Sequence, residues 1–106
     1  MANDAKDKKI SSLISLSVRA GLTAYGETMC EKALRNGEAQ LVIISRDASD
    51  NTKKKFTQKA FYYNVPVVFY GDKSELGKLT GAGSTSSVCV TDKNFSQMIT
   101  EAIQSA

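Results

Sequence analysis

The fold class is decided by a short stretch in the middle of the chain, AQLVIIS at residues 39–45. Four branched apolar residues, Leu41 to Ile44, stand in a row between turn-forming residues. A continuous apolar run of this length is typical of a strand that is buried on both faces. The sequence therefore predicts a central strand whose sheet is covered by helices on both sides.

Helical and strand-like segments alternate on both sides of this strand. The first helix is expected to begin at Asp7, its N-cap, and to end near Gly21, and Gly26 is expected to open the second. The expected helices are 7–21, 26–36, 52–64, 73–80 and 92–103, and the expected strands are 22–25, 39–45, 67–70 and 88–91. This order predicts an α/β fold, a three-layer α/β/α sandwich with a mixed sheet of about four strands. We expect a single domain over residues 1–106, with residues 1–6 frayed.

The composition excludes several classes of protein. The 106 residues suit one globular domain, and the net charge of +3 permits an anionic partner without requiring one. The absence of histidine excludes His-based acid–base and nucleophilic catalysis. The polar start and the lack of a run of about 20 apolar residues predict a cytoplasmic protein without a membrane span.

No cluster of residues predicts an enzyme, a metal site or a cofactor. Cys30 and Cys89 are far apart in the sequence and are expected to be small core residues. Asp47 and Asp50 stand where helix caps belong. The cluster Gly81-Ala82-Gly83 lacks the context of a dinucleotide turn and favours a flexible loop. We expect no small-molecule substrate.

Positive charge is concentrated in the first part of the chain. Residues 1–60 hold 11 basic and 7 acidic residues, whereas residues 61–106 hold 3 basic and 4 acidic ones. The run Lys53-Lys54-Lys55 is expected in the first turn of a helix, where the helix dipole disfavours cations. Such a misfit favours a binding role, although a solvated basic face is an equal alternative.

The expected start of the second helix is the other candidate site. Gly26, Glu27 and Thr28 would present free backbone N–H groups at the positive end of a helix, which suits an anion or a base edge. Lys32 and Arg35 would follow Thr28 on one exposed face. The alternative is a helix that merely begins after a tight turn.

Several motifs in this chain resemble a known family. They are GETMCEKALRNG at 26–37, AQLVIISRDAS at 39–49, NVPV at 64–67 and LGKLTG at 76–81. Their order and spacing resemble the kink-turn-binding ribosomal proteins of the large-subunit L7Ae and L30e type. The stretches DASDNTKKK at 47–55, FYYNVP at 61–66 and SELG at 74–77 resemble its bacterial YlxQ-type branch. The resemblance extends over residues 10–104.

The resemblance implies an α/β/α sandwich that binds a kinked RNA internal loop through the N-terminus of its second helix. The family pattern there, G-x-N-E-x-x-K, aligns its Gly with Gly26 and its Lys with Lys32, whereas Thr28 and Met29 replace its Asn and Glu. The threonine hydroxyl can still form a hydrogen bond, but methionine cannot accept one as a carboxylate does.

The resemblance also implies a second contact, from the loop at residues 81–86 to a flipped-out base, and basic side chains that neutralise phosphates. The RNA-binding residues expected on this basis are Gly26, Glu27, Thr28, Met29, Lys32, Arg35, Arg46, Gly83, Ser84 and Thr85. Structured RNA and the ribosome are the expected partners.

A protein-interaction module on the same fold, with weak or no specific RNA binding, is the alternative. An exposed apolar patch at Tyr25, Met29 or Phe61 would support it.

Overall fold

The computed structural model describes residues 4–105, which form five helices and one four-stranded sheet. The elements are α1 (Asp4–Arg19), β1 (Thr23–Tyr25), α2 (Glu27–Arg35), β2 (Leu41–Ile44), α3 (Asp50–Tyr62), β3 (Val67–Phe69), α4 (Lys73–Thr80), β4 (Ser87–Val90) and α5 (Lys93–Gln104). Their order is the predicted one. The predicted fold class, an α/β sandwich with a mixed four-stranded sheet, is confirmed.

Two helix starts and the assignment of caps differ from the prediction. Helix α1 begins at Asp4, so residues 4–6 are helical and Asp7 is not its cap, while residues 1–3 lie outside the described residues. Helix α3 begins at Asp50 because the Ser49 side chain caps it by accepting a hydrogen bond from the Thr52 N–H. The Asp47 carboxylate instead accepts from the Lys73 N–H at the start of α4.

The strand order in the sheet is β1-β4-β2-β3, so the last strand lies in the middle. Strand β4 is antiparallel to both of its neighbours, and β2 is parallel to β3. Every residue of β2 and β4 is buried, which confirms the prediction for Leu41 to Ile44. The two central strands are thus the ones that have a helical layer on each face.

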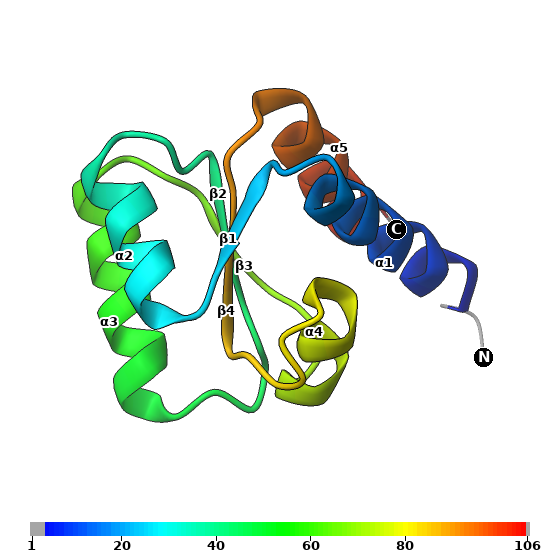
Figure 1. The fold of residues 1–106 in the computed structure, drawn as a ribbon, viewed down its shortest axis with the longest axis horizontal. Helices are drawn as coiled ribbons and strands as arrows, with labels where there is room; N and C mark the ends of the chain where they lie inside the picture. The colour runs from blue at the N-terminus through cyan, green and yellow to red at the C-terminus, as the bar shows by residue number, and fades with distance from the viewer. Residues whose placement is uncertain (1–3, 106) are drawn as a thin grey trace.

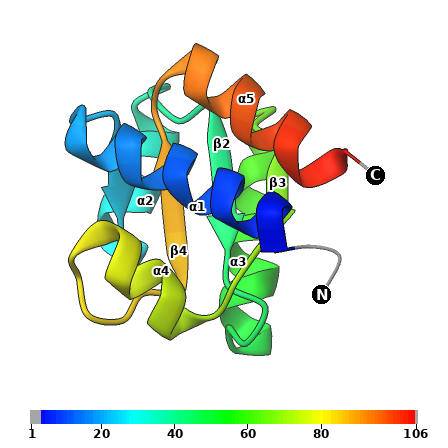
Figure 2. The ribbon, with the colours of Figure 1, turned by 90° about the vertical axis from the view of Figure 1, so that its right-hand side faces the viewer.

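The two faces of the sheet carry different layers. Helices α2 and α3 cover one face, and α1, α4 and α5 cover the other (Figure 1 and Figure 2). Successive side chains of β2 alternate between them. Val42 and Ile44 pack in the core under α2 and α3, whereas Leu41 and Ile43 pack in the core under the other three helices.

The structural elements of the candidate site meet at one edge of the sheet. Strand β1 ends there beside the start of β4, since Tyr25 pairs with Val88. Strand β2 ends there too, with Ile44 opposite both Ser87 and Phe69. Helices α2 and α3 both begin at this edge and run side by side away from it (Figure 1). We call it the α2-start edge.

Candidate nucleic-acid interface

Helix α2 begins without a side-chain cap. Its N-cap residue is Gly26, with φ 87° and ψ 157°, and no side chain among residues 4–105 caps the helix. The first bond of the helix runs from the Cys30 N–H to the Gly26 carbonyl oxygen, at 3.0 Å. The N–H groups of Glu27, Thr28 and Met29 therefore have no acceptor within the helix. These donors lie at the positive end of the helix dipole.

The other helix starts with a described N-cap are capped. Ser49, Asp72 and Asp92 each accept a hydrogen bond from a backbone N–H in the first turn of α3, α4 and α5. The chain thus supplies a cap at each of these starts but not at α2. The uncapped start is consistent with the site that the resemblance implies.

Backbone hydrogen bonds fix the α2 start against its neighbours. The Gly26 N–H donates to the Ser87 carbonyl oxygen at 3.1 Å, and the Ser45 N–H donates to that of Ser86 at 3.0 Å. The loop that enters β4 is thereby joined both to the α2 start and to the end of β2. Gly26, Arg46 and the loop at residues 81–86 accordingly all lie at the α2-start edge, as the RNA-binding prediction requires.

The loop at residues 81–86 is more firmly held than its composition indicates. The Thr85 N–H donates to the Lys73 carbonyl oxygen at 3.1 Å, and the Ala82 N–H donates to that of Gly77 at 3.0 Å. A Cβ on Gly77 would overlap the Gly83 carbonyl oxygen, so α4 and the loop are in close contact. The loop is thus joined to α4 by two backbone hydrogen bonds.

Only part of this loop is available to a ligand. Gly83 and Ser84 are exposed, whereas Thr85 is buried. The Thr85 hydroxyl donates to the Ser87 carbonyl oxygen at 3.2 Å. Thr85 was predicted to contact RNA, and its side chain instead supports the loop.

Three basic residues of the candidate site are exposed, but they occupy different places. Arg46 lies at the α2-start edge, with its guanidinium carbon 5.8 Å from the centre of the Tyr70 ring. Lys32 lies about two turns along α2. Arg35 is the last residue of α2, roughly 13 Å from Gly26 at 1.5 Å per residue. The structure brings Arg46 near the α2 start, whereas Lys32 and Arg35 both lie in the last turn of the helix.

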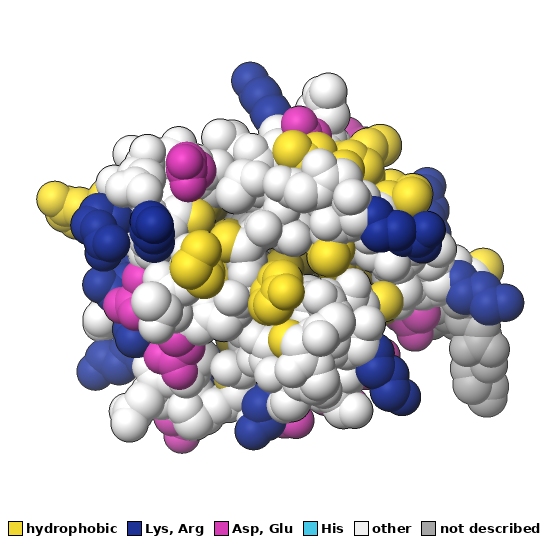
Figure 3. All heavy atoms as spheres, in the orientation of Figure 1, with side chains coloured by type: hydrophobic (Ala, Val, Ile, Leu, Met, Phe, Trp, Pro, Cys, Tyr) yellow, Lys and Arg dark blue, Asp and Glu magenta, His cyan; other side chains and the backbone are white. Residues whose placement is uncertain are grey.

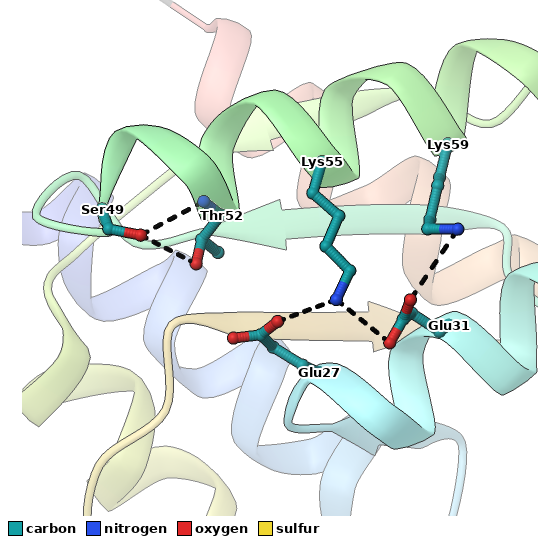
Figure 4. A network of polar contacts seen from close by, with 6 residues as sticks. All are labelled: Glu27, Glu31, Ser49, Thr52, Lys55 and Lys59. Carbon is teal, nitrogen blue, oxygen red and sulfur yellow. Dashed lines mark hydrogen bonds and ion pairs between the residues drawn. The ribbon is translucent and has the colours of Figure 1, made fainter.

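A network of ion pairs between α2 and α3 was not expected from the sequence. The Lys55 ammonium lies 3.0 Å from a Glu27 carboxylate oxygen and 3.2 Å from one of Glu31 (Figure 4). Lys59 lies 3.7 Å from Glu31. Hydrogen bonds to Glu27 and then to Glu31 raise the pKa of Lys55. Lys55 therefore bridges α2 and α3 at the surface of the molecule.

This network revises the expectation for the lysine run. Helix α3 begins at Asp50, so Lys53 lies in its first turn, whereas Lys54 and Lys55 lie beyond it. The prediction of three cations in the first turn was wrong for those two. Glu27, predicted to contact RNA, is paired with Lys55 but remains exposed. Its partner lay 28 residues away in the sequence, which no local pattern indicates.

The net charge of the chain lies on the layer formed by α2 and α3. These two helices contain six basic and three acidic residues, a net charge of +3 that equals that of the whole chain. Dark-blue side chains gather over these helices at the left of Figure 3. The uncapped helix start thus belongs to the basic face of the molecule.

The two cysteines lie under this layer. Cys30 and Cys89 are fully buried free thiols, as expected for core residues. Hydrogen bonding to Cys30 and burial raise the pKa of the Cys89 thiol. Residues 4–105 hold no group of three or more His, Cys, Asp or Glu side chains that could bind a metal ion. None of the helices described is long and apolar enough to cross a membrane.

Comparison with known proteins places the chain in a family. Residues 8–100 match the model of the ribosomal protein L7Ae/L30e/S12e/Gadd45 family, a range that contains every candidate site residue. The chain belongs to this family. The resemblance seen in the sequence motifs is thereby confirmed.

Individual members of the L7Ae/L30e/S12e/Gadd45 family are similar over most of the chain. A Bacillus subtilis protein named RNA-binding protein YlxQ is 38% identical over 82% of this chain and 87% of its own. An Enterococcus faecium protein of the same name is 37% identical, over 74% of this chain and 77% of its own. A solved structure of a Bacillus halodurans protein of unknown function is 36% identical, with a TM-score of 0.87 over 92% of this chain and 98% of that one.

Proposed function

We propose that this chain is a non-enzymatic, ribosome-associated RNA-binding protein that recognises a kink-turn-like structured RNA through the start of α2. One observation carries the proposal. The uncapped start of α2, which belongs to the basic layer, shares one edge with Arg46 and with the Gly83–Ser84 part of the loop at residues 81–86. The names of the two YlxQ relatives support RNA as the ligand.

The proposed contacts divide among three groups. The free N–H groups of Glu27 to Met29 and the Thr28 hydroxyl meet phosphate oxygens and base edges of the bent RNA. Lys32 and Arg46 neutralise phosphates, and this makes binding sensitive to salt. Gly83 and Ser84 touch an extruded nucleotide through their backbone, because neither has a large side chain. Arg35, in the last turn of α2 with Lys32, is a further candidate for a phosphate contact.

A titration tests the proposal directly. Labelled RNA containing a consensus kink-turn is compared with a plain duplex of equal length, each at two salt concentrations. Selective binding of the kink-turn RNA that weakens with salt is the expected result. Equal affinity for both RNAs, or no binding to either, would rule out kink-turn recognition.

A protein-interaction module remains the second candidate, and exposed apolar side chains favour it. Met29 is 50% exposed in the first turn of α2, and Tyr25 is 39% exposed just before it. Met29→Ser separates the two functions. If Met29 belongs to a protein docking site, the variant should bind its protein partner more weakly and keep its affinity for the kink-turn RNA. If Met29 belongs to an RNA site, the affinity for the kink-turn RNA should change.

A further inference from the structure

The end of α3 exposes an unusual group of aromatic side chains. Phe61 is 85% exposed, Tyr62 is 77% exposed and Tyr63 is 37% exposed. The rings of Tyr62 and Tyr63 meet edge to face, with their centres 4.9 Å apart. Aromatic side chains normally contribute buried area to a core or an interface. Phe61 and Tyr62 contribute little to the core of this fold and are available to a partner.

These aromatic residues stand in a segment that has basic residues but no acidic ones. Between Asn51 and Gly71 the chain has four lysines and no aspartate or glutamate. Lys54, Gln58 and Phe61 follow one another at helical spacing and are all exposed. The surface of α3 from Lys54 to its last residues is therefore both apolar and positively charged. We define the aromatic surface as Lys54, Phe61, Tyr62 and Tyr63.

Both acidic residues of α2 are paired with lysines of α3, and the one acidic residue of α3, Asp50, lies in its first turn. Glu27 and Glu31 of α2 both pair with Lys55, and Glu31 is also near Lys59. Lys54 forms no ion pair within residues 4–105 and remains available to an anion. Figure 3 shows hydrophobic side chains that project beyond the upper end of α3, next to basic ones. The charge complementarity favours a polyanion as the occupant.

We propose that the aromatic surface binds a single-stranded segment of RNA, with bases stacked on Phe61 and Tyr62 and a phosphate near Lys54. Flat aromatic rings beside cations are the combination that single strands need, because every base has a face to stack and every nucleotide has a charge. The inference rests on the proposed function, since it assigns a second surface for the same class of ligand. Phe61 and Tyr62 lie at the end of α3 away from the α2-start edge, and Lys54 lies about 10 Å nearer to that edge on a helix about 20 Å long. A single strand that leaves the bound kink-turn would have to run along the α2–α3 layer to reach it.

The experiment compares three RNAs in fluorescence anisotropy. The first is the kink-turn RNA, the second is the same RNA with a single-stranded uridine tail of about ten nucleotides, and the third is the tail alone; the length follows typical site sizes for single strands. The tail is expected to raise the affinity of the protein by about tenfold for each base that stacks. The double variant Phe61→Ala/Tyr62→Ala should lose this gain.

A matched control uses an exposed apolar residue on the opposite helical layer. Met98 of α5 is 42% exposed, and Met98→Ala should keep the gain from the tail. Phe61→Trp adds a direct reporter, because the chain has no tryptophan. Its emission should change with the tailed RNA and the tail alone, and not with the untailed kink-turn RNA.

The outcomes separate this inference from the proposed function. Failure of the untailed kink-turn RNA to bind would contradict the proposed function, while the tail alone would still test the aromatic surface. If the unmodified protein binds the tailed and the untailed RNA with equal affinity, the inference is wrong. The aromatic surface would then be a candidate site for a protein partner. The inference would also be wrong if the double variant lost equal affinity for the tailed and the untailed RNA. Phe61 and Tyr62 would then act through the stability of the fold or through the site at the α2 start.

Discussion

At Gly26 the backbone adopts a conformation that strains any residue with a side chain. Its φ of 87° and ψ of 157° lie in a region that is essentially restricted to glycine. A Cβ built there would meet no atom within 4 Å, so the strain comes from the backbone and not from crowding. The space that a side chain at Gly26 would enter is therefore open.

Gly26→Ala should lower the free energy of unfolding by about 1–3 kcal/mol, because it imposes this strain. It should also weaken binding of the kink-turn RNA, because the strain is relieved by moving the α2 start. Gly37→Ala is the matched control, since Gly37 has φ 74° and open space but follows the other end of α2. Urea denaturation and RNA titration should show that both variants are less stable and that only Gly26→Ala loses affinity. A similar loss of affinity in Gly37→Ala would contradict the placement of the site.

The residue at position 28 gives a prediction of improved binding. Thr28 offers one hydroxyl, whereas an asparagine amide can donate and accept at a base edge simultaneously. Thr28→Asn is expected to strengthen binding of the kink-turn RNA by roughly fivefold or more, since a bidentate base contact contributes about 1–3 kcal/mol. Thr57→Asn, at an exposed position of α3, is the control in the same titration. An unchanged affinity in Thr28→Asn would mean that this side chain does not face a base.

At the scale of elements, α4 determines where the loop at residues 81–86 lies. The loop is bonded to the Lys73 and Gly77 carbonyl oxygens, and Gly77 admits the Gly83 backbone into direct contact. Helix α4 thus positions this loop at the α2-start edge.

Gly77→Ala tests this contact, because its new Cβ would overlap the Gly83 carbonyl group. We expect a less stable protein with a displaced loop, and RNA binding that weakens if Gly83 and Ser84 touch the ligand. Ser74→Ala, at an exposed position of the same helix, should change neither property. Amide hydrogen exchange of residues 82–85 would report the displacement. Full RNA affinity with a displaced loop would remove Gly83 and Ser84 from the site.

The same elements show why sequence predicted one part of the structure and not another. Helical spacing and the apolar run at residues 41–44 are local patterns, and they correctly predicted the order of the elements and the buried strand. The contact of Gly77 with Gly83 and the pairing of Lys55 with Glu27 depend on which segments the fold brings together. The position of β4 between β1 and β2 is likewise a tertiary property. The burial of the Thr85 side chain was missed because exposure cannot be read from spacing alone.

At the scale of the whole molecule, the charge is unevenly distributed. The α2–α3 layer carries a net charge equal to that of the whole chain, so the rest of the molecule is neutral in sum. Binding that uses this layer should depend on the position of a lysine and not only on the total charge.

Lys32→Ala should weaken binding of the kink-turn RNA and make its dependence on salt less steep, because one phosphate contact is lost. Lys78→Ala removes the same charge from α4 on the other layer and is the control. Titrations of both variants over a series of salt concentrations provide the measurement. If the salt dependence of RNA affinity changed equally in the two variants, only the overall charge of the protein would matter.

The one-sided charge also affects the approach to a ligand before any contact forms. A molecule that is basic on one layer and neutral elsewhere experiences a torque in the field of a polyanion, and it turns its basic side forward while it diffuses. More of its collisions then begin with α2 and α3 facing the ligand. This rotation would appear in the association rate at low ionic strength and would leave the lifetime of the complex almost unaffected.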